Sequence, residues 1–302
     1  MKKFIIWVVV ILIVVFGFYL LFKRAPTENY YPANGNTTTT TQTASSSQPV
    51  AQEDKTKTVI GQSAENRDIV AYHFGSGDKE LLFVGGIHGG YEWNTVLLAY
   101  QLMDYLKKYP NAIPAGVKVT VIPVLNPDGL NKVVGTTTGN FSKADVSNSQ
   151  STVIAGRFNA NNVDLSRNFD CDWQASGTWQ SRTVSGGDAA FSEPESLAFK
   201  NYVDANSPSA VVFWYSSAGG VYSSSCDAAV SSETKSLTTA YASASGYTAY
   251  SKFNAYPVTG DVVDWLAKEN IPAVSVLLAT HDSSEWAKNW AGIQAVLKSY
   301  AQ

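Results

Sequence analysis

Short, almost continuous apolar runs, separated by segments with helical patterning, constrain the fold of this chain more than any other feature. A strand that is apolar along its whole length is typical of a sheet covered on both faces. The runs that predict such strands are residues 80–86, 117–125, 209–215 and 271–278. A β-rich hairpin at residues 58–77 precedes them, and helices are predicted at residues 92–108, from 192, and at 233–246, 261–269 and 284–300. This alternation predicts a single-domain α/β fold, with a mixed, mostly parallel sheet and helices on both faces.

The first 24 residues have a different character. An uncharged apolar run, residues 4–22, lies between two basic pairs. At about 1.5 Å per residue, a helix of this length just crosses a hydrocarbon core of roughly 30 Å, and no small-residue cleavage site follows it. A buried core helix is the alternative, but no polar stripe interrupts the run. We therefore predict that residues 1–24 are an uncleaved signal anchor with one transmembrane helix, which contacts the membrane through residues 4–22.

Residues 25–57 are rich in Thr and Ser and poor in apolar side chains, so they bury too little surface to offset the entropy of ordering. They predict a disordered linker to a globular domain at residues 58–302, which the single-pass anchor would hold outside the cytoplasm. Basic residues on both sides of the apolar run orient it only weakly. Cys171 and Cys226 could pair there or stay as separate thiols, and the sequence does not decide. The net charge of −3 gives no sign of a nucleic-acid partner.

Polar clusters follow the predicted strands at the point where each strand ends, which is where ligands bind in such folds. His88 and Glu92 follow the first buried strand, and a His and a Glu on one short turn could be two ligands of a metal ion. A His beside glycines is more often structural. The other clusters are Asn126 to Gly129, Arg157 with Asp164 to Phe169, Tyr215 to Ser217, and Tyr256. A Gly-, Ser- and Asn-rich region at about 130–190 has no clear pattern, and structureless stretches of that length are usually functional.

Five short motifs, taken together, are far more specific than any one of these clusters. They are GGIHGGYEWNT, IPVLNPDG, VDLSRNFD, FSEPESLAF and AYPVTGDVVDW. In this order, and over most of residues 58–302, they resemble the carboxypeptidase A type family of zinc exopeptidases. The resemblance implies a zinc ion on two His and one Glu, which polarises the scissile carbonyl and activates water. It also implies a separate Glu as general base and an Arg that stabilises the oxyanion.

Several residues of this chain match the site that the resemblance implies. His88 and Glu92 match two zinc ligands, and Arg157 matches the oxyanion Arg. Zinc is therefore the cofactor that the resemblance implies.

The substrate-binding positions are also recognisable. Arg167 stands where the family grips the terminal carboxylate of its substrate, a task that suits the planar fork of Arg. Its neighbour Ser166 takes the place of an Asn that helps in this grip. Tyr256 matches the tyrosine that caps the substrate. Val263 falls at the specificity position, where a neutral side chain disfavours a charged terminal residue.

Two positions depart from the family pattern. The third zinc ligand should be a His at the end of the strand SAVVFW, where Tyr215 stands, or Ser216 if the frame slips by one. A phenol with a pKa of about 10 is a poor zinc ligand. The general base should be a Glu at the end of the last strand, where Leu277 stands, or Leu278 after the same slip. Leucine cannot accept a proton, and a positioned base contributes roughly 10²–10⁴ in rate.

The residues support three hypotheses. The leading one is a membrane-anchored, degenerate carboxypeptidase that binds the C-termini of peptides or peptidoglycan stems without cleaving them. The second is an active metallocarboxypeptidase with an altered zinc site, in which His281 is the third ligand and Asp282 or Glu285 is the base. The third is a structural ectodomain with a vestigial pocket.

Overall fold

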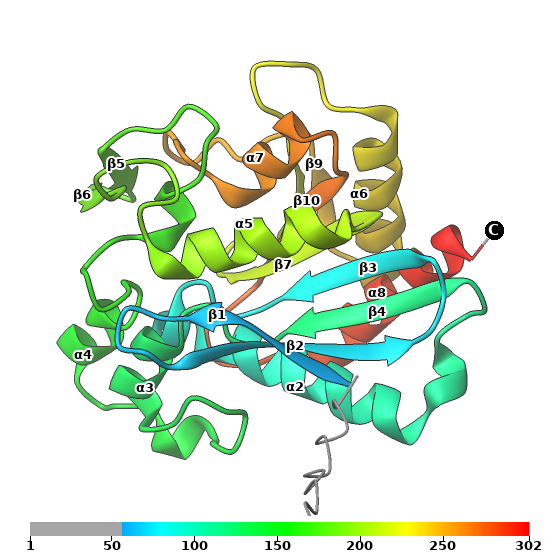
Figure 1. Cartoon of the computed structure of the whole chain (residues 1–302), viewed down its shortest axis with the longest axis horizontal. Coiled ribbons are helices and arrows are strands. Elements are labelled where there is room, and N and C mark those ends of the chain that lie inside the picture. The colour runs from blue at the N-terminus through cyan, green and yellow to red at the C-terminus, as the bar shows by residue number, and fades with distance from the viewer. Residues whose placement is uncertain (1–55, 302) are drawn as a thin grey trace, which may run out of the picture. The chain divides into compact units, whose positions relative to one another are not determined.

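One sheet of eight strands organises the part of the chain that the computed structural model describes, residues 56–301 (Figure 1). The strand order is β1-β2-β4-β3-β7-β10-β8-β9. The strands are β1 (Lys57–Gln62), β2 (Asp68–Gly75), β3 (Lys79–Val84), β4 (Val117–Ile122), β7 (Ala210–Ser216), β8 (Gly220–Ser223), β9 (Thr248–Tyr250) and β10 (Ala273–Leu278). The neighbours β4, β3, β7 and β10 run parallel, as do β8 and β9, whereas β1 with β2, β2 with β4, and β10 with β8 are antiparallel. The predicted mixed, mostly parallel sheet is confirmed.

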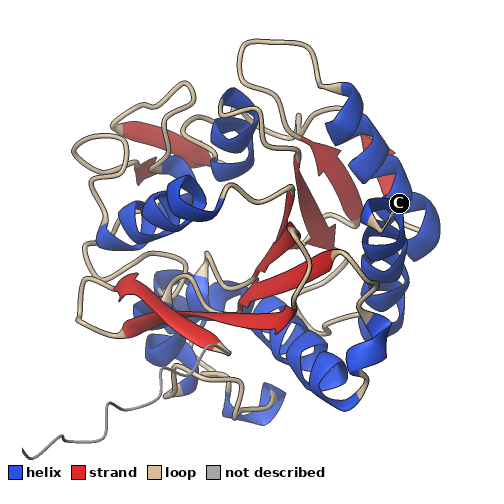
Figure 2. Ribbon diagram, turned by 45° about the vertical axis from the view of Figure 1, so that its right-hand side comes forward, coloured by secondary structure: helices blue, strands red, loops and turns tan. Residues whose placement is uncertain are grey.

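Helices cover both faces of this sheet (Figure 2). They include α2 (Trp93–Lys108), α5 (Pro194–Asn206), α6 (Ser232–Ser245), α7 (Val262–Lys268) and α8 (Trp286–Tyr300). Apolar side chains of α2, α6 and α8 share one core cluster with the sheet, and those of α5 and α7 share a second cluster on its other face. The predicted covering of both faces is therefore present in the structure.

Strand β7 illustrates why the central strands are apolar throughout. Successive side chains of a strand point to opposite faces, and here Val212 and Trp214 belong to the cluster of α2, α6 and α8. Phe213 and Tyr215 belong to the cluster of α5 and α7. Since both faces are buried, neither set of positions tolerates an exposed polar residue, and the sequence shows a continuous apolar run.

The structure adds short elements that the sequence does not predict. Within the region at about 130–190, they are α4 (Gln150–Ala155) and the hairpin of β5 (Ser176–Trp179) and β6 (Arg182–Ser185), with α3 (Pro127–Val134) at its start. Single-turn 3₁₀ helices occur at Gly89–Glu92, Pro110–Ala112, Lys143–Asp145 and Leu165–Arg167. Strands β8 and β9 are also unpredicted, because runs of three or four residues are too short for periodicity to register. The region is thus a series of short, hydrogen-bonded elements rather than one long loop.

The predicted anchor at residues 1–24 and most of the predicted linker at 25–57 lie outside the described residues. Strand β1 begins at Lys57, so the last predicted linker residue already belongs to the sheet. Within residues 56–301, no helix combines the length and hydropathy needed to cross a membrane.

A disulfide joins Cys171 to Cys226, with the two Cα atoms 5.9 Å apart. The two residues are 55 positions apart in the chain. Their pairing, which the sequence leaves open, therefore ties the segment after Phe169 to the segment that follows β8.

Candidate functional site

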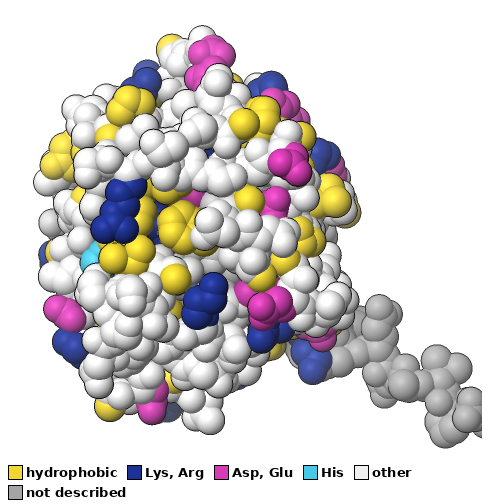
Figure 3. Space-filling view, turned by 90° about the vertical axis from the view of Figure 1, so that its left-hand side faces the viewer, with side chains coloured by type: hydrophobic (Ala, Val, Ile, Leu, Met, Phe, Trp, Pro, Cys, Tyr) yellow, Lys and Arg dark blue, Asp and Glu magenta, His cyan; other side chains and the backbone are white. Residues whose placement is uncertain are grey.

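A cavity of about 840 Å³ lies at the carboxyl ends of β3, β7 and β10, where polar clusters were expected. All nine residues that the sequence predicts for the site line it: His88, Glu92, Arg157, Ser166, Arg167, Tyr215, Tyr256, Val263 and Leu277. Figure 3 looks at the side of the molecule that carries the β5–β6 hairpin, and it shows hydrophobic side chains in a recess with Lys and Arg side chains beside it. The parallel strands explain this convergence, because their carboxyl ends share one edge of the sheet.

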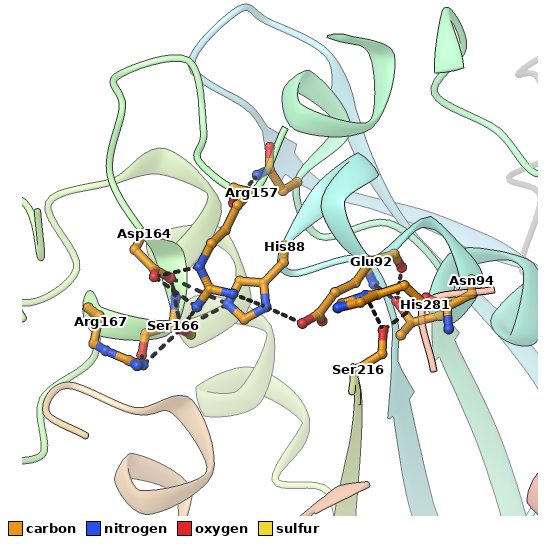
Figure 4. A network of polar contacts seen from close by, with 12 residues as sticks. His88, Glu92, Asn94, Arg157, Asp164, Ser166, Arg167, Ser216 and His281 are labelled. Atoms are coloured by element: carbon orange, nitrogen blue, oxygen red, sulfur yellow. Dashed lines mark hydrogen bonds and ion pairs between the residues drawn. The ribbon is translucent and has the colours of Figure 1, made fainter. Parts of the chain in front are cut away.

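His88 is the centre of a buried polar network (Figure 4). Its Nδ1 atom lies 3.0 Å from Oε1 of Glu92 and 3.1 Å from a terminal nitrogen of Arg157. Its Nε2 atom lies 2.9 Å from Oγ of Ser166 and 3.4 Å from Oδ1 of Asp164. Both ring nitrogens therefore have protein partners, and one of these partners is the Arg157 cation.

Arg157 and Asp164 form an ion pair that is almost fully buried. The Nε and a terminal nitrogen of Arg157 each lie 2.9 Å from Oδ2 of Asp164, and the guanidinium stacks 4.5 Å from the ring centre of Trp179. Burial by itself raises the pKa of Asp164, but Arg157 and then the hydrogen bond to His88 hold the pKa of this carboxyl well below its usual range. Asp164 is therefore an anion that fixes Arg157 against His88.

Arg167 lies in a different electrostatic setting. The residue is 3% exposed and donates to the carbonyl and hydroxyl oxygens of Ser166, at 2.8 and 2.9 Å, and to the carbonyl of Thr178 at 3.0 Å. Among the described residues, no carboxylate lies within 4 Å of its guanidinium nitrogens. A buried cation that is bonded only to neutral oxygens, and that lines a cavity, is suited to an anionic ligand.

Tyr215 ends the apolar run of β7 and points into the cavity from the face that α5 and α7 cover. Burial, and after it the nearby Asp261 and Glu92, raise the pKa of Tyr215 well above its ordinary value. Its hydroxyl has no hydrogen-bond partner in the described residues, and the same is true of Oε2 of Glu92. Tyr215 is therefore a neutral phenol that offers an unused donor to the cavity.

Leu277 adjoins Tyr215 on the neighbouring strand, because the two are partners in the parallel register of β10 and β7. Both line the cavity. Val263 lies buried in the first turn of α7, and Tyr256 lies with its ring 6.0 Å from the Arg167 guanidinium. The predicted substrate-side residues therefore line the same cavity as Arg167.

His281, Asp282 and Glu285, the residues of the hypothetical altered zinc site, have other partners in the structure. Nδ1 of His281 lies 3.1 Å from Oγ of Ser216, and its ring packs against Tyr91. Asp282 is exposed and pairs with Lys143. Glu285 accepts from the backbone of Ala279 and from Tyr247. Of these three candidates only His281 lines the cavity, so the structure does not supply the proposed carboxylate base there.

The sequence does not identify three acidic residues of the site. Asp164 stands inside a recognised motif that assigns it no role, and Asp261 and Asp264 flank the specificity position, Val263. Burial raises the pKa of Asp261, and burial followed by the Asp261 charge raises the pKa of Asp264 to about 7. The motif AYPVTGDVVDW contains the signal that could have identified two of these acids. Asp261 lies two positions before Val263 and Asp264 lies one position after it, and all three line the cavity.

Asp264→Asn is expected to stabilise the protein increasingly as the pH rises from about 4 to 8. A carboxyl whose pKa is raised by folding destabilises the folded state above its unfolded pKa of about 3.9, and the full cost is reached above the folded pKa of about 7. Asn keeps the acceptor for the backbone N–H of Ser225 without the charge. Thermal unfolding at pH 4 and pH 8 checks this: the variant should gain several °C at pH 8 and almost nothing at pH 4. An equal gain at both values would contradict it.

A sequence model described as zinc carboxypeptidase matches residues 49–298. The chain belongs to the zinc carboxypeptidase family. Among curated proteins, bacteriocin BCN5 of Clostridium perfringens is 35% identical over 80 residues, which is 25% of this chain and 9% of that protein. The chain thus spans only a small part of this relative.

Solved structures of an amidase and of a carboxypeptidase share the fold. Murein-tripeptide amidase MpaA from Escherichia coli O157 is 18% identical, with a TM-score of 0.57 over 80% of this chain and 90% of that one. Carboxypeptidase A from Helicoverpa armigera is 18% identical, with a TM-score of 0.60 over 82% and 68% of the two chains. The carboxypeptidase-like fold expected from the motifs is confirmed.

The zinc that the family uses requires donors that the described residues do not bring together. A catalytic zinc site has three protein ligands, almost always His, Cys, Asp or Glu. His88 and Glu92 converge, but within residues 56–301 no group of three or more such side chains could hold a metal ion. Arg157 adds a positive charge 3.1 Å from Nδ1 of His88. This donor set does not fit the three-ligand site, and no catalytic step through zinc is derived from it.

Proposed function

We propose that this member of the zinc carboxypeptidase family is a pseudoenzyme that binds the free C-termini of peptides without cleaving them. In this proposal Arg167 and Ser166 hold the terminal carboxylate and Tyr256 covers the bound residue. Residues 1–24 anchor the domain to a membrane, outside the cytoplasm, through the linker at 25–57.

The observation that carries the binding role is the buried Arg167 without a carboxylate partner among the described residues. Placing a guanidinium in a protein interior is costly unless a negative charge offsets it. Arg157, by comparison, has its own counter-ion in Asp164, at 2.9 Å. A ligand carboxylate in the cavity would supply the charge that Arg167 lacks, and it would form a bidentate pair.

Two features of the cavity support the loss of catalysis. Tyr215, at the position of the expected third ligand, is a neutral phenol. Leu277 stands at the position of the expected base and cannot take a proton from water. Asp282 and Glu285, the two carboxylates considered as a substitute base, do not line the cavity. With these features, the pocket keeps the residues that would bind a carboxylate and lacks the residues that would catalyse hydrolysis.

The proposed ligand class includes peptidoglycan stem peptides. One structural relative is a murein-tripeptide amidase and one curated relative is a bacteriocin. A domain held outside the cytoplasm would meet such stems, which end in free carboxylates. The cavity volume of about 840 Å³ is ample for one or two terminal residues.

Arg167→Ala is expected to weaken the binding of a peptide acid by about 10- to 100-fold, the usual value of a charge-assisted pair. Calorimetric titration of the full-length chain with a tripeptide acid, and with the same peptide as its carboxamide, measures this. The carboxamide should bind as weakly to the native protein as the acid does to the variant. Arg182→Ala, which alters an exposed strand residue of the β5–β6 hairpin, is the matched control.

Zinc content and peptide hydrolysis, measured on the same protein, test the pseudoenzyme proposal. We expect far less than one zinc per chain and no release of terminal residues. Stoichiometric zinc together with turnover that a chelator abolishes would refute it. Peptide binding that is indifferent to Arg167→Ala would instead favour the structural ectodomain.

A further inference from the structure

Two buried side chains of the cavity carry polar atoms that no described residue satisfies. Within residues 56–301, Oε2 of Glu92 and the hydroxyl of Tyr215 both lack a hydrogen-bond partner. The two residues are 2% and 6% exposed, and both line the cavity. An unpaired donor or acceptor in a protein interior is destabilising, all the more so on a charged group. A bound molecule that pairs with both atoms would remove this penalty.

The two atoms differ in what they require from a ligand. A carboxylate oxygen such as Oε2 of Glu92 accepts a hydrogen bond, whereas the neutral phenol of Tyr215 can donate one. A ligand group that matches both atoms must therefore carry a donor and an acceptor. The peptide group has this character and occurs in every peptide ligand, with its N–H and C=O directed to opposite sides.

Both residues lie close to the group proposed to hold the terminal carboxylate. His88 contacts each of them: its ring centre is 5.3 Å from that of Tyr215, and its Nδ1 atom is 3.0 Å from Oε1 of Glu92 (Figure 4). On the other side of the same ring, Nε2 lies 2.9 Å from Oγ of Ser166, which accepts from Arg167 at 2.9 Å. An extended peptide rises about 3.3–3.6 Å per residue. A ligand whose carboxylate pairs with Arg167 therefore has its last peptide group only about one residue further along the chain.

Arg157, the other cation that could bind a ligand carbonyl, already has protein partners. Its nitrogens lie 2.9 Å from Oδ2 of Asp164 and 3.1 Å from Nδ1 of His88. The described donor set also does not fit a metal ion, which polarises the carbonyl in the family. Among the described residues that line the cavity, Tyr215 has the only buried side-chain donor without a partner. Its hydroxyl is therefore the donor that remains for a carbonyl oxygen.

We infer that Tyr215 and Glu92 bind the last peptide group of the ligand, with the Tyr215 hydroxyl donating to its carbonyl oxygen and Oε2 of Glu92 accepting from its N–H. The inference rests on the proposed binding of the terminal carboxylate by Arg167 and adds recognition of an amide. It gives Tyr215 the contact with the carbonyl that a metal ion makes in the family, and it gives Glu92 a role that needs no zinc. The site would thus distinguish a terminal amide bond from a terminal ester bond.

A peptide acid and its ester analogue test the inference. Acetyl-Ala-Ala-Ala and acetyl-Ala-Ala-lactate have the same length, terminal methyl group and carboxylate, but in the second an ester oxygen replaces the last N–H. Both are titrated calorimetrically into the full-length chain after dialysis against a chelator. The ester should bind about 10- to 100-fold more weakly, because it loses the bond to Glu92 and sets an oxygen lone pair against the carboxylate. Equal affinities for the two ligands would refute the inference.

Variants assign the two contacts to their residues. Glu92→Gln should bring the ratio of amide to ester affinity close to one, because the Gln side chain offers a donor as well as an acceptor. Tyr215→Phe should weaken both ligands by about 3- to 10-fold, the usual value of a neutral hydrogen bond, and leave their ratio unchanged. Glu233→Gln and Tyr109→Phe alter exposed side chains in the same way and are the matched controls. A ratio that Glu92→Gln leaves unchanged, or affinities that Tyr215→Phe leaves unchanged, would overturn the contact made by that residue.

The carboxamide of the same tripeptide separates this inference from the proposed function. If the acid binds better than the carboxamide but the ester binds as tightly as the amide, the recognition of the peptide group is refuted and the carboxylate-binding function stands. If the acid binds no better than its carboxamide, the proposed function itself fails. These comparisons use the native protein alone, so they do not depend on the folding of any variant.

Discussion

The double variant Tyr215→His with Leu277→Glu is expected to bind about one zinc ion per chain and to release C-terminal residues from peptides. The two positions are register partners on β7 and β10, so both new side chains would enter the cavity from neighbouring strands. The introduced imidazole would complete a three-ligand set with His88 and Glu92. The introduced carboxylate would supply a general base, which contributes roughly 10²–10⁴ in rate. Metal analysis and a peptide-hydrolysis assay measure the two gains separately.

The single variants show which residue limits which step. Tyr215→His alone should bind zinc and turn over slowly, whereas Leu277→Glu alone should gain neither zinc nor activity. Tyr215→Phe, which removes only the hydroxyl, and Leu277→Gln, which adds no base, are the matched controls. A double variant that is folded and zinc-loaded but inactive would show that these two positions are not what separates this chain from an active enzyme.

Asp164→Asn is expected to lower the free energy of unfolding by about 3–5 kcal/mol, the usual cost of leaving one partner of a buried ion pair alone. Asp164 is the counter-ion of Arg157 and also accepts from Oγ of Ser166 at 2.8 Å. For a domain of this size the change corresponds to a fall of about 10 °C in melting temperature. Thermal or denaturant unfolding measures it.

Asp170→Asn provides the matched control for this prediction. Asp170 also pairs with a cation at 2.8 Å, but both it and Lys268 are about half exposed. Exposed pairs contribute about 0–1 kcal/mol, so this variant should unfold close to the native temperature. Equal effects of the two variants would mean that the Arg157–Asp164 pair is not the buried, unscreened interaction that the geometry indicates.

Part of the site could be predicted because the fold is a parallel α/β sheet, whereas Leu277, Val263 and the role of each residue came from the motifs that resemble the family. His88, Tyr215 and Leu277 each stand at or just after the end of an apolar run, and the ends of parallel strands meet at one edge. The strands could be predicted from the apolar runs because both faces of the sheet are buried. Strand β7, for example, needs apolar residues on both faces. Strand β9, short and exposed, carries no such signal.

The sequence by itself determined the α/β architecture, the family and the residues that gather around the cavity, because strand patterning and short motifs are local properties of the chain. Only the tertiary structure decided how the charges of the described residues are partnered: Arg157 is neutralised by Asp164 against His88, whereas Arg167 lacks a carboxylate partner within 4 Å. It also brought Asp261 and Asp264 to the pocket of Val263 and joined Cys171 to Cys226. The physical reason is that electrostatic interactions depend on distance and burial between segments far apart in the chain, which no local pattern encodes.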